Sequence, residues 1–120
     1  MNEAGIRGLQ NASPEKRFQS FLTTAADREE VYLLTYDGEW AAMELGERDG
    51  VPIWPEAVFA KDFCDDEVKA TPMEVHAFLD RCRELEEGIA FFVFPTDKDT
   101  YVIDKDSLRA KLQEALDEVE

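Results

Sequence analysis

Apolar residues recur along this chain in two different periods, which predict helices in some segments and strands in others. The first helical stripe consists of apolar residues at three- and four-residue spacing: Phe18, Phe21, Leu22 and Ala25. Ser13 lies before this stripe and is a suitable N-cap, and Pro14 suits the first helical turn, where no backbone N–H is needed. A helix is therefore expected from Pro14 onward.

A hairpin is expected after this helix. Residues 31–36 are β-branched and aromatic, which is typical of a strand. Asp37 and Gly38 then provide the two positive-φ positions that a tight two-residue turn demands. Residues 39–45 are therefore expected to return as the second strand.

Two further strand segments differ in their expected place in the sheet. Residues 51–54 can form a short strand, but Pro52 lacks the N–H that a ladder requires, so this strand is expected at a sheet edge. Residues 89–94 are apolar without alternation, as in a strand whose two faces are both covered. This segment is therefore expected at the centre of the sheet, with residues 100–103 pairing back against it.

Two helices are expected between these strands. Pro55 opens the first, which is expected to end at the exposed acidic loop of residues 65–67. Thr71 with Glu74 three residues later forms a capping box, and Pro72 between them occupies the first helical position. A second helix is therefore expected to begin at this capping box.

The last helix is expected to have Asp104 or Asp106 as its cap, since either residue is suitable. The predicted order is thus α-β-β-β-α-α-β-β-α, with short turns that favour a mostly antiparallel sheet of about five strands and helices packed on it. We therefore predict an α+β fold. The 120 residues, of which 44% are hydrophobic, suit one core, so we expect a single domain over residues 13–120. Residues 1–12 have no consistent apolar period and are interpreted as a mobile leader.

Two short motifs and the acidic C-terminal helix carry a resemblance to a known family. The first motif, residues 51–60, places Trp54 between Pro52 and Pro55, and the second is the strand end Phe94-Pro95-Thr96. From Phe18 to the C-terminus the chain resembles the bacterial family called domain of unknown function 2750. That family has no assigned activity, so the resemblance implies a fold but no reaction.

The charge of the chain narrows the classes of partner. A formal net charge of −15 arises from 28 acidic and 13 basic residues, spread over both halves of the chain. Such a surface repels nucleic acid and anionic lipid, so we expect no nucleic-acid or membrane partner and allow a basic or neutral protein partner. Residues 1–12 contain no secretory signal, so the cytoplasm is expected, with Cys64 and Cys82 as reduced thiols and no disulfide.

Recognised catalytic and cofactor-binding motifs do not emerge from the sequence. The six glycines do not form a phosphate-binding loop. His76 is the single histidine and has no cysteine or histidine at a zinc-binding spacing, while the acidic residues after Cys64 disfavour its thiolate. We therefore expect no cofactor, no metal site and no catalytic residue that the sequence alone identifies.

Aromatic and acidic residues provide the remaining candidates, as one interaction surface: Trp54, Tyr36, Trp40, Asp65, Asp66 and Glu67. Trp54 is expected to be buried against Phe59 or Phe63, with its indole N–H bonded to a backbone carbonyl, although an exposed anchor would need the same rigidity.

The function that these observations favour is a non-enzymatic acidic protein-interaction domain, such as an adaptor or an immunity-like inhibitor of a basic partner. One alternative is a small carboxylate-dependent hydrolase with its site around Trp54 and the acidic loop. A deep pocket that raises the pKa of a carboxyl group would favour that enzyme. The other alternative is a small-molecule sensor, which a closed apolar cavity under the sheet would favour.

Overall fold

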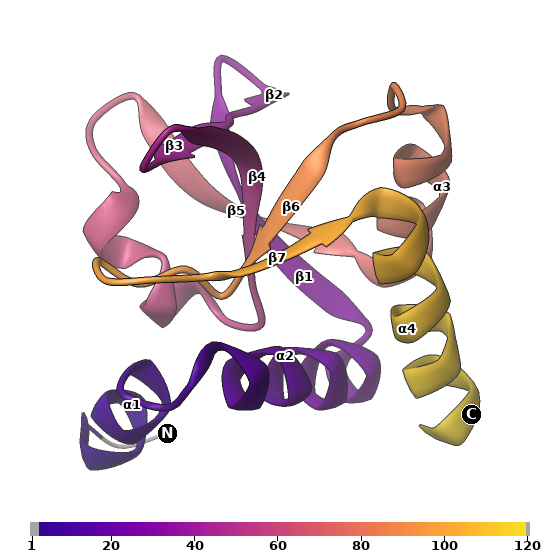
Figure 1. Ribbon diagram of the computed structural model, residues 1–120, viewed down its shortest axis with the longest axis horizontal. Helices are drawn as coiled ribbons and strands as arrows, with labels where there is room; N and C mark the ends of the chain where they lie inside the picture. Colours follow the sequence, from indigo (N-terminus) through magenta and orange to yellow (C-terminus); the bar gives the residue numbers. More distant parts are fainter. Residues whose placement is uncertain (1–2, 120) are drawn as a thin grey trace.

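A computed structural model describes residues 3–119 as one mixed β-sheet with four α-helices packed around it (Figure 1). The strands are β1 (Glu30–Tyr36), β2 (Glu39–Trp40), β3 (Met43–Leu45), β4 (Arg48–Trp54), β5 (Val68–Glu74), β6 (Ala90–Val93) and β7 (Tyr101–Asp104). The α-helices are α1 (Glu3–Gln10), α2 (Pro14–Arg28), α3 (Val75–Glu84) and α4 (Lys105–Val119), and two short 3₁₀ helices are η1 (Ala57–Phe59) and η2 (Lys61–Phe63). The predicted α+β class is confirmed.

The sheet is antiparallel except for one pair of strands. β1 pairs with β5 along its whole length on one side, and with β4 and then β2 on the other side. β4 runs parallel to β6, and β6 pairs antiparallel with β7. The sheet has seven strands instead of about five. The additional strands are β5, where a helix start was predicted, and β3, which pairs separately with β4.

The predicted hairpin turn and the predicted inner strand are both confirmed, but the returning strand expected over residues 39–45 is split: Glu39 and Trp40 pair with β1, whereas Met43–Leu45 pair with β4. Asp37 and Gly38 have φ angles of 52° and 81°, and Tyr36 pairs directly with Glu39, so the turn has two residues. β6 lies between β4 and β7, and its residues Phe91, Phe92 and Val93 are buried. Because neighbouring strand residues point to opposite faces, burial of all three requires cover on both faces.

Helices α2, α3 and α4 cover one face of the sheet, and the 3₁₀ segment covers part of the other. Phe78 of α3 packs edge-on against Phe91, with ring centroids 5.6 Å apart, which places Phe91 on the helix side. Val93 lies on the same side as Phe91 and pairs in register with Ile53. Trp54 follows Ile53 and therefore points to the opposite face, where Phe63 of η2 packs against it.

Pro52 lies in an inner strand, so its predicted edge position is wrong. The register that pairs Leu33 with Ile53 brings Leu34 next to Pro52. The carbonyl of Leu34 accepts a hydrogen bond from the N–H of Ala41 (2.8 Å), which replaces the donor that proline lacks. An inner strand therefore tolerates this proline because the neighbouring chain supplies the missing bond.

The predicted capping box at Thr71 is also wrong. Thr71 and Pro72 lie within β5, and α3 begins only after Glu74, whose carboxylate accepts hydrogen bonds from the N–H groups of His76 (2.7 Å) and Ala77 (3.3 Å). Val75 N–H donates to Glu29 on the β1 side, so the alternation of the strand turns the nitrogen of Pro72 to the outer edge of β5. Proline is tolerated at such an edge position.

Two other segments differ from the sequence-based expectation. Residues 57–63 form two single-turn 3₁₀ helices in place of the longer helix expected after Pro55. Residues 3–10, expected as part of a mobile leader over residues 1–12, form helix α1; residues 1 and 2 lie outside the described part. The acidic loop over residues 65–67 is exposed, as predicted. Asp104 is the cap of α4, since its carboxylate accepts from the N–H of Ser107 (3.0 Å).

Candidate functional site

The two sequence motifs meet through the buried Trp54. Its ring is fully buried, and its indole N–H donates to the carbonyl of Pro95 across 3.1 Å. The ring also packs against Phe63, with centroids 5.2 Å apart. The predicted burial and hydrogen bond of Trp54 are therefore confirmed, and its partner is Phe63 of the two aromatic residues proposed.

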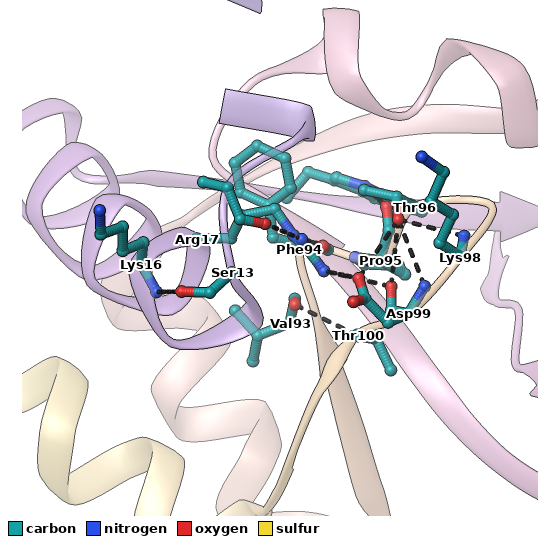
Figure 2. Close-up of polar contacts among 12 residues, drawn as sticks. Ser13, Lys16, Arg17, Val93, Phe94, Pro95, Thr96, Lys98, Asp99 and Thr100 are labelled. Carbon is teal, nitrogen blue, oxygen red and sulfur yellow. Dashed lines mark hydrogen bonds and ion pairs between the residues drawn. The ribbon is translucent and has the colours of Figure 1, made fainter. Parts of the chain in front are cut away.

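Arg17 of α2 holds the second motif from the other side (Figure 2). Its side chain is only 1% exposed. The Nε atom donates to the carbonyl of Phe94 (3.0 Å), one terminal nitrogen donates to the carbonyl of Ala12, and the other forms an ion pair with the carboxylate of Asp99. One buried guanidinium thus joins α2, the segment before it and the loop between β6 and β7.

Phe94 adopts a backbone conformation that is rare for a residue with a side chain. Its φ is 53°, and left-handed geometry of this kind costs an aromatic residue about 1–3 kcal/mol unless its surroundings impose it. The N–H of Phe94 donates to Ile53 (2.7 Å), its carbonyl accepts from Arg17, and its ring packs on Phe59 at 4.5 Å. These contacts fix the direction in which the chain leaves β6.

The loop after Phe94 is closed by a compact turn (Figure 2). The N–H of Thr96 donates to the carbonyl of Asp99 (2.9 Å). The hydroxyl of Thr96 accepts from the N–H groups of Lys98 (3.2 Å) and Asp99 (3.3 Å). Arg17 and Trp54 therefore support a loop that also has its own internal hydrogen bonds.

A cleft of about 590 Å³ lies where this loop faces α1 and the 3₁₀ segment. We call it the motif cleft, and its lining residues are Arg7, Gln10, Asn11, Phe59, Asp62, Phe63, Pro95, Thr96, Asp97 and Lys98. Two of them, Phe59 and Phe63, pack at a tilt against the aromatic rings of Phe94 and Trp54. Both sequence motifs therefore contribute to the same cleft.

A second candidate surface lies at one end of the β1 and β5 pair. Tyr36 is 52% exposed and pairs in register with Val68, the residue that directly follows the acidic loop. Asp37 and Glu39 in the hairpin next to Tyr36 are also exposed. We call this surface the acidic end, and it consists of Tyr36, Asp37, Glu39, Asp65, Asp66 and Glu67.

Asp65 shapes the acidic loop. Its carboxylate accepts hydrogen bonds from the N–H groups of Val68 (2.7 Å) and Glu67 (2.8 Å), and these bonds lower the pKa of Asp65 below its ordinary value. The ammonium of Lys69 donates to the carbonyl of Asp65 (3.0 Å). Asp65 is therefore an ionised turn-forming residue, whereas Asp66 and Glu67 extend the acidic surface.

The structure brings only part of the predicted interaction surface together. Tyr36 lies beside the acidic loop, as described for the acidic end. Trp54 is buried beneath the motif cleft. Trp40 is half-buried on the opposite face from Tyr36, where it stacks on Phe78 of α3 at 5.6 Å and lies under the guanidinium of Arg81. Trp40 therefore belongs to the packing of α3 on the sheet.

Sequence reasoning missed Arg17 and the motif cleft. The one sequence signal for Arg17 was its position four residues before Phe21, on the buried face of α2. The cleft had no such signal, because its walls come from three segments that are far apart in the sequence.

The two thiols lie in different environments. Cys64 is partly buried and its Sγ donates to the carbonyl of Ala60 (3.3 Å). Cys82 is buried on α3, and desolvation raises the pKa of its thiol to about 12. His76 is exposed on α3. Over residues 3–119, no group of three or more histidine, cysteine, aspartate or glutamate side chains is arranged to hold a metal ion. None of the helices in this part of the chain is long and apolar enough to cross a membrane.

The fold and the motif cleft define a small α+β protein in which a tryptophan-proline segment and a Phe-Pro-Thr loop meet at one surface. The chain belongs to the family described as Protein of unknown function (DUF2750), whose model matches residues 18–112. The resemblance drawn from the two motifs is therefore confirmed at the level of the family. A comparison with curated proteins finds no match.

Proposed function

We propose that this chain is a non-enzymatic protein-interaction domain, an adaptor or an immunity-like inhibitor, whose acidic end binds a basic segment of another protein. The observation that carries the proposal is the register of β1 with β5, which sets the exposed Tyr36 beside the acidic loop. Lysine and arginine side chains suit such a surface, because the face of a phenol ring attracts cations and the carboxylates add their charge.

The charge of the whole chain supports the same kind of partner. If each of the 13 basic residues paired with one of the 28 acidic residues, 15 carboxylates would still have no basic partner. A field of this size accelerates the approach of a cationic protein and is screened beyond about 8 Å at physiological ionic strength. We further propose that the protein works in the cytoplasm, where the thiols of Cys64 and Cys82 remain reduced.

The carboxyl groups with shifted pKa values favour a binding function over a carboxylate-dependent hydrolase. Such a hydrolase needs one carboxyl group with a raised pKa that can donate a proton. Hydrogen bonds from backbone N–H groups instead lower the pKa values of Asp65, in the acidic loop, and of Asp104, at the start of α4. Both groups therefore stay ionised, as a surface for cations requires. The motif cleft is open with a charged rim, so it is not the closed apolar cavity under the sheet on which the sensor alternative was based.

The proposal is tested with a synthetic 12-residue peptide of lysine and arginine alternating with serine, titrated into ¹⁵N-labelled protein. We expect the largest amide shifts in the hairpin around Tyr36 and in the acidic loop. The double variant Asp66→Asn/Glu67→Gln and the single variant Tyr36→Ser should each weaken binding roughly fivefold to tenfold.

A matched variant separates a specific surface from general acidity. Glu114→Gln/Glu118→Gln removes two charges from exposed positions on α4 and should change the affinity less than about twofold. The association rate should fall as salt rises, while the dissociation rate changes little. Equal losses in the two double variants, or shifts spread over every acidic segment, would show that the acidity serves solubility alone.

A further inference from the structure

We propose that the motif cleft is a binding site for a small zwitterion with a large apolar side chain, either a free amino acid or a dipeptide. This site shares no residue with the acidic end, so the inference is independent of the proposed function. Its volume of about 590 Å³ falls within the range of about 300–1,000 Å³ that is usual for small-molecule sites.

The aromatic part of the cleft suits an apolar side chain. Phe63 is partly exposed and contributes apolar surface to the lining, and the buried Phe59 and Pro95 lie behind it. Each ring rests on a buried aromatic residue, Phe59 on Phe94 and Phe63 on Trp54. The rings cannot turn away without disturbing the core, so a ligand side chain would meet a surface whose shape is already set.

The charged lining of the cleft suits a ligand with one positive and one negative group. Lys98 offers a cation to a carboxylate, Asp62 and Asp97 offer carboxylates to an ammonium, and Arg7 adds a second positive charge to the lining. The four charges sum to zero, in contrast to the rest of this acidic chain. A ligand with a net charge of either sign would be attracted by one pair and repelled by the other, whereas a zwitterion satisfies both.

The loop that carries Lys98 and Asp97 is held in place by the rest of the fold. Arg17 donates to the carbonyl of Phe94, and the hydroxyl of Thr96 closes the turn by accepting from the N–H of Lys98 (Figure 2). Trp54 donates to the carbonyl of Pro95. The left-handed conformation of Phe94 is maintained by these contacts. Strain that the fold maintains next to a cleft is typical of a binding site, and a fixed loop reduces the entropy lost when a ligand binds.

The cleft is shared between the family domain and a segment outside it. The matched residues 18–112 include the lining residues Phe59, Asp62 and Phe63 and the loop residues 95–98. Arg7, Gln10 and Asn11 come instead from α1 and the residue after it. We infer that α1 determines which zwitterion this chain prefers, since it supplies one wall of the cleft.

The test uses ¹⁵N-labelled full-length protein and four probes that share a benzene ring. L-phenylalanine and the dipeptide Ala-Phe carry both charges, 3-phenylpropionate lacks the ammonium, and phenethylamine lacks the carboxylate. We expect at least one zwitterion to shift amides of residues 59–63 and 96–98 in a saturable manner. Its affinity should exceed that of both singly charged analogues by about tenfold. Tighter binding of Ala-Phe than of phenylalanine would assign the site to a dipeptide, and the reverse to a free amino acid.

Charge variants assign the two ligand groups to their partners. Lys98→Gln should weaken binding of the zwitterion by about fivefold and so reduce its advantage over phenethylamine from about tenfold to about twofold. Asp62→Asn should weaken binding of the zwitterion to a similar extent and reduce its advantage over 3-phenylpropionate. Lys111→Gln and Glu118→Gln are the matched controls on α4, and neither should alter affinity. Both cleft side chains are exposed, so unfolding curves should confirm intact folds.

Two results would overturn the proposal. If all four probes bind equally, the cleft recognises only the benzene ring. If no probe shows saturable shifts up to about 10 mM, which corresponds to less than about 3 kcal/mol of binding energy, the cleft binds no such ligand. Neither result bears on the basic peptide, whose binding is measured at the acidic end.

Discussion

Truncation of Trp54 should destabilise the protein strongly, because this side chain joins the two motifs from a fully buried position. Trp54→Ala removes the ring that packs on Phe63 and leaves a cavity, which costs about 3–5 kcal/mol for a buried tryptophan. A domain of this size has a total stability of roughly 5–15 kcal/mol. The variant should therefore lose a large part of its stability.

Trp54→Phe separates the hydrogen bond from the packing. Phenylalanine keeps most of the ring but leaves the carbonyl of Pro95 without its donor, which costs about 1–3 kcal/mol at a buried site. With a change of roughly 4 °C in Tm for each kcal/mol, we expect Trp54→Phe to melt about 4–12 °C below the parent. Trp54→Ala should melt lower still or remain unfolded.

The measurements are urea unfolding at 25 °C and thermal unfolding, both followed by circular dichroism. Acrylamide quenching is measured in a Trp40→Phe background with excitation that avoids tyrosine, so that Trp54 is the single tryptophan observed. We expect weak quenching in the folded protein and strong quenching in urea. If Trp54→Ala melts within about 2 °C of its parent and Trp54 is quenched as readily as free tryptophan, its burial is refuted.

Other predictions test the remaining contacts. Arg17→Met should lower the free energy of unfolding in urea by about 3 kcal/mol or more, because the carbonyls of Phe94 and Ala12 lose their donors. Arg17→Lys should recover only part of this loss. An unchanged midpoint in both variants would contradict the contacts of Arg17. A thiol reagent at pH 8 should modify Cys64 while Cys82 reacts only after unfolding, because burial raises the Cys82 pKa to about 12; mass spectrometry of the labelled peptides decides this. The pKa of Asp65 is lowered in the folded state, so its stabilising contribution is complete above the ordinary value of 3.8 and is lost as the pH falls through the lower folded value. Asp65→Asn should therefore flatten the acid limb of a plot of stability against pH, and an identical limb in both proteins would refute the turn contacts.

Features that depend on neighbouring residues were predictable from the sequence. The Asp37-Gly38 turn follows from the φ angles that these residues tolerate, and the inner position of β6 follows from its unbroken apolar run. The burial of Trp54 was expected from the size of its ring, whereas the rigidity that the flanking prolines impose would suit an exposed anchor equally. Each of these features is encoded within about ten residues of chain.

Features that depend on distant partners were not predictable in the same way. Thr71, Pro72 and Glu74 match a capping box, but the pairing of this segment with β1 outweighs the local preference and turns it into a strand. Pro52 is tolerated inside the sheet because Ala41 bonds to the carbonyl next to it. Among the site residues, Arg17 illustrates the same limit: its acceptor on Phe94 lies 77 residues away, so no local pattern indicates the contact.

The outer edge of β5 is poorly suited to receive a strand from another molecule. Pro72 turns a nitrogen without hydrogen toward this edge, and the carbonyl of Val68 is already bonded to the N–H of Asp65 (3.0 Å). A foreign strand along this edge would lack two of its hydrogen bonds, which discourages copies of the chain from joining edge to edge into fibrils. Any partner that the acidic end binds, as we propose, would therefore be recognised through side chains, and a few charge substitutions there would change its preference while the fold stays the same.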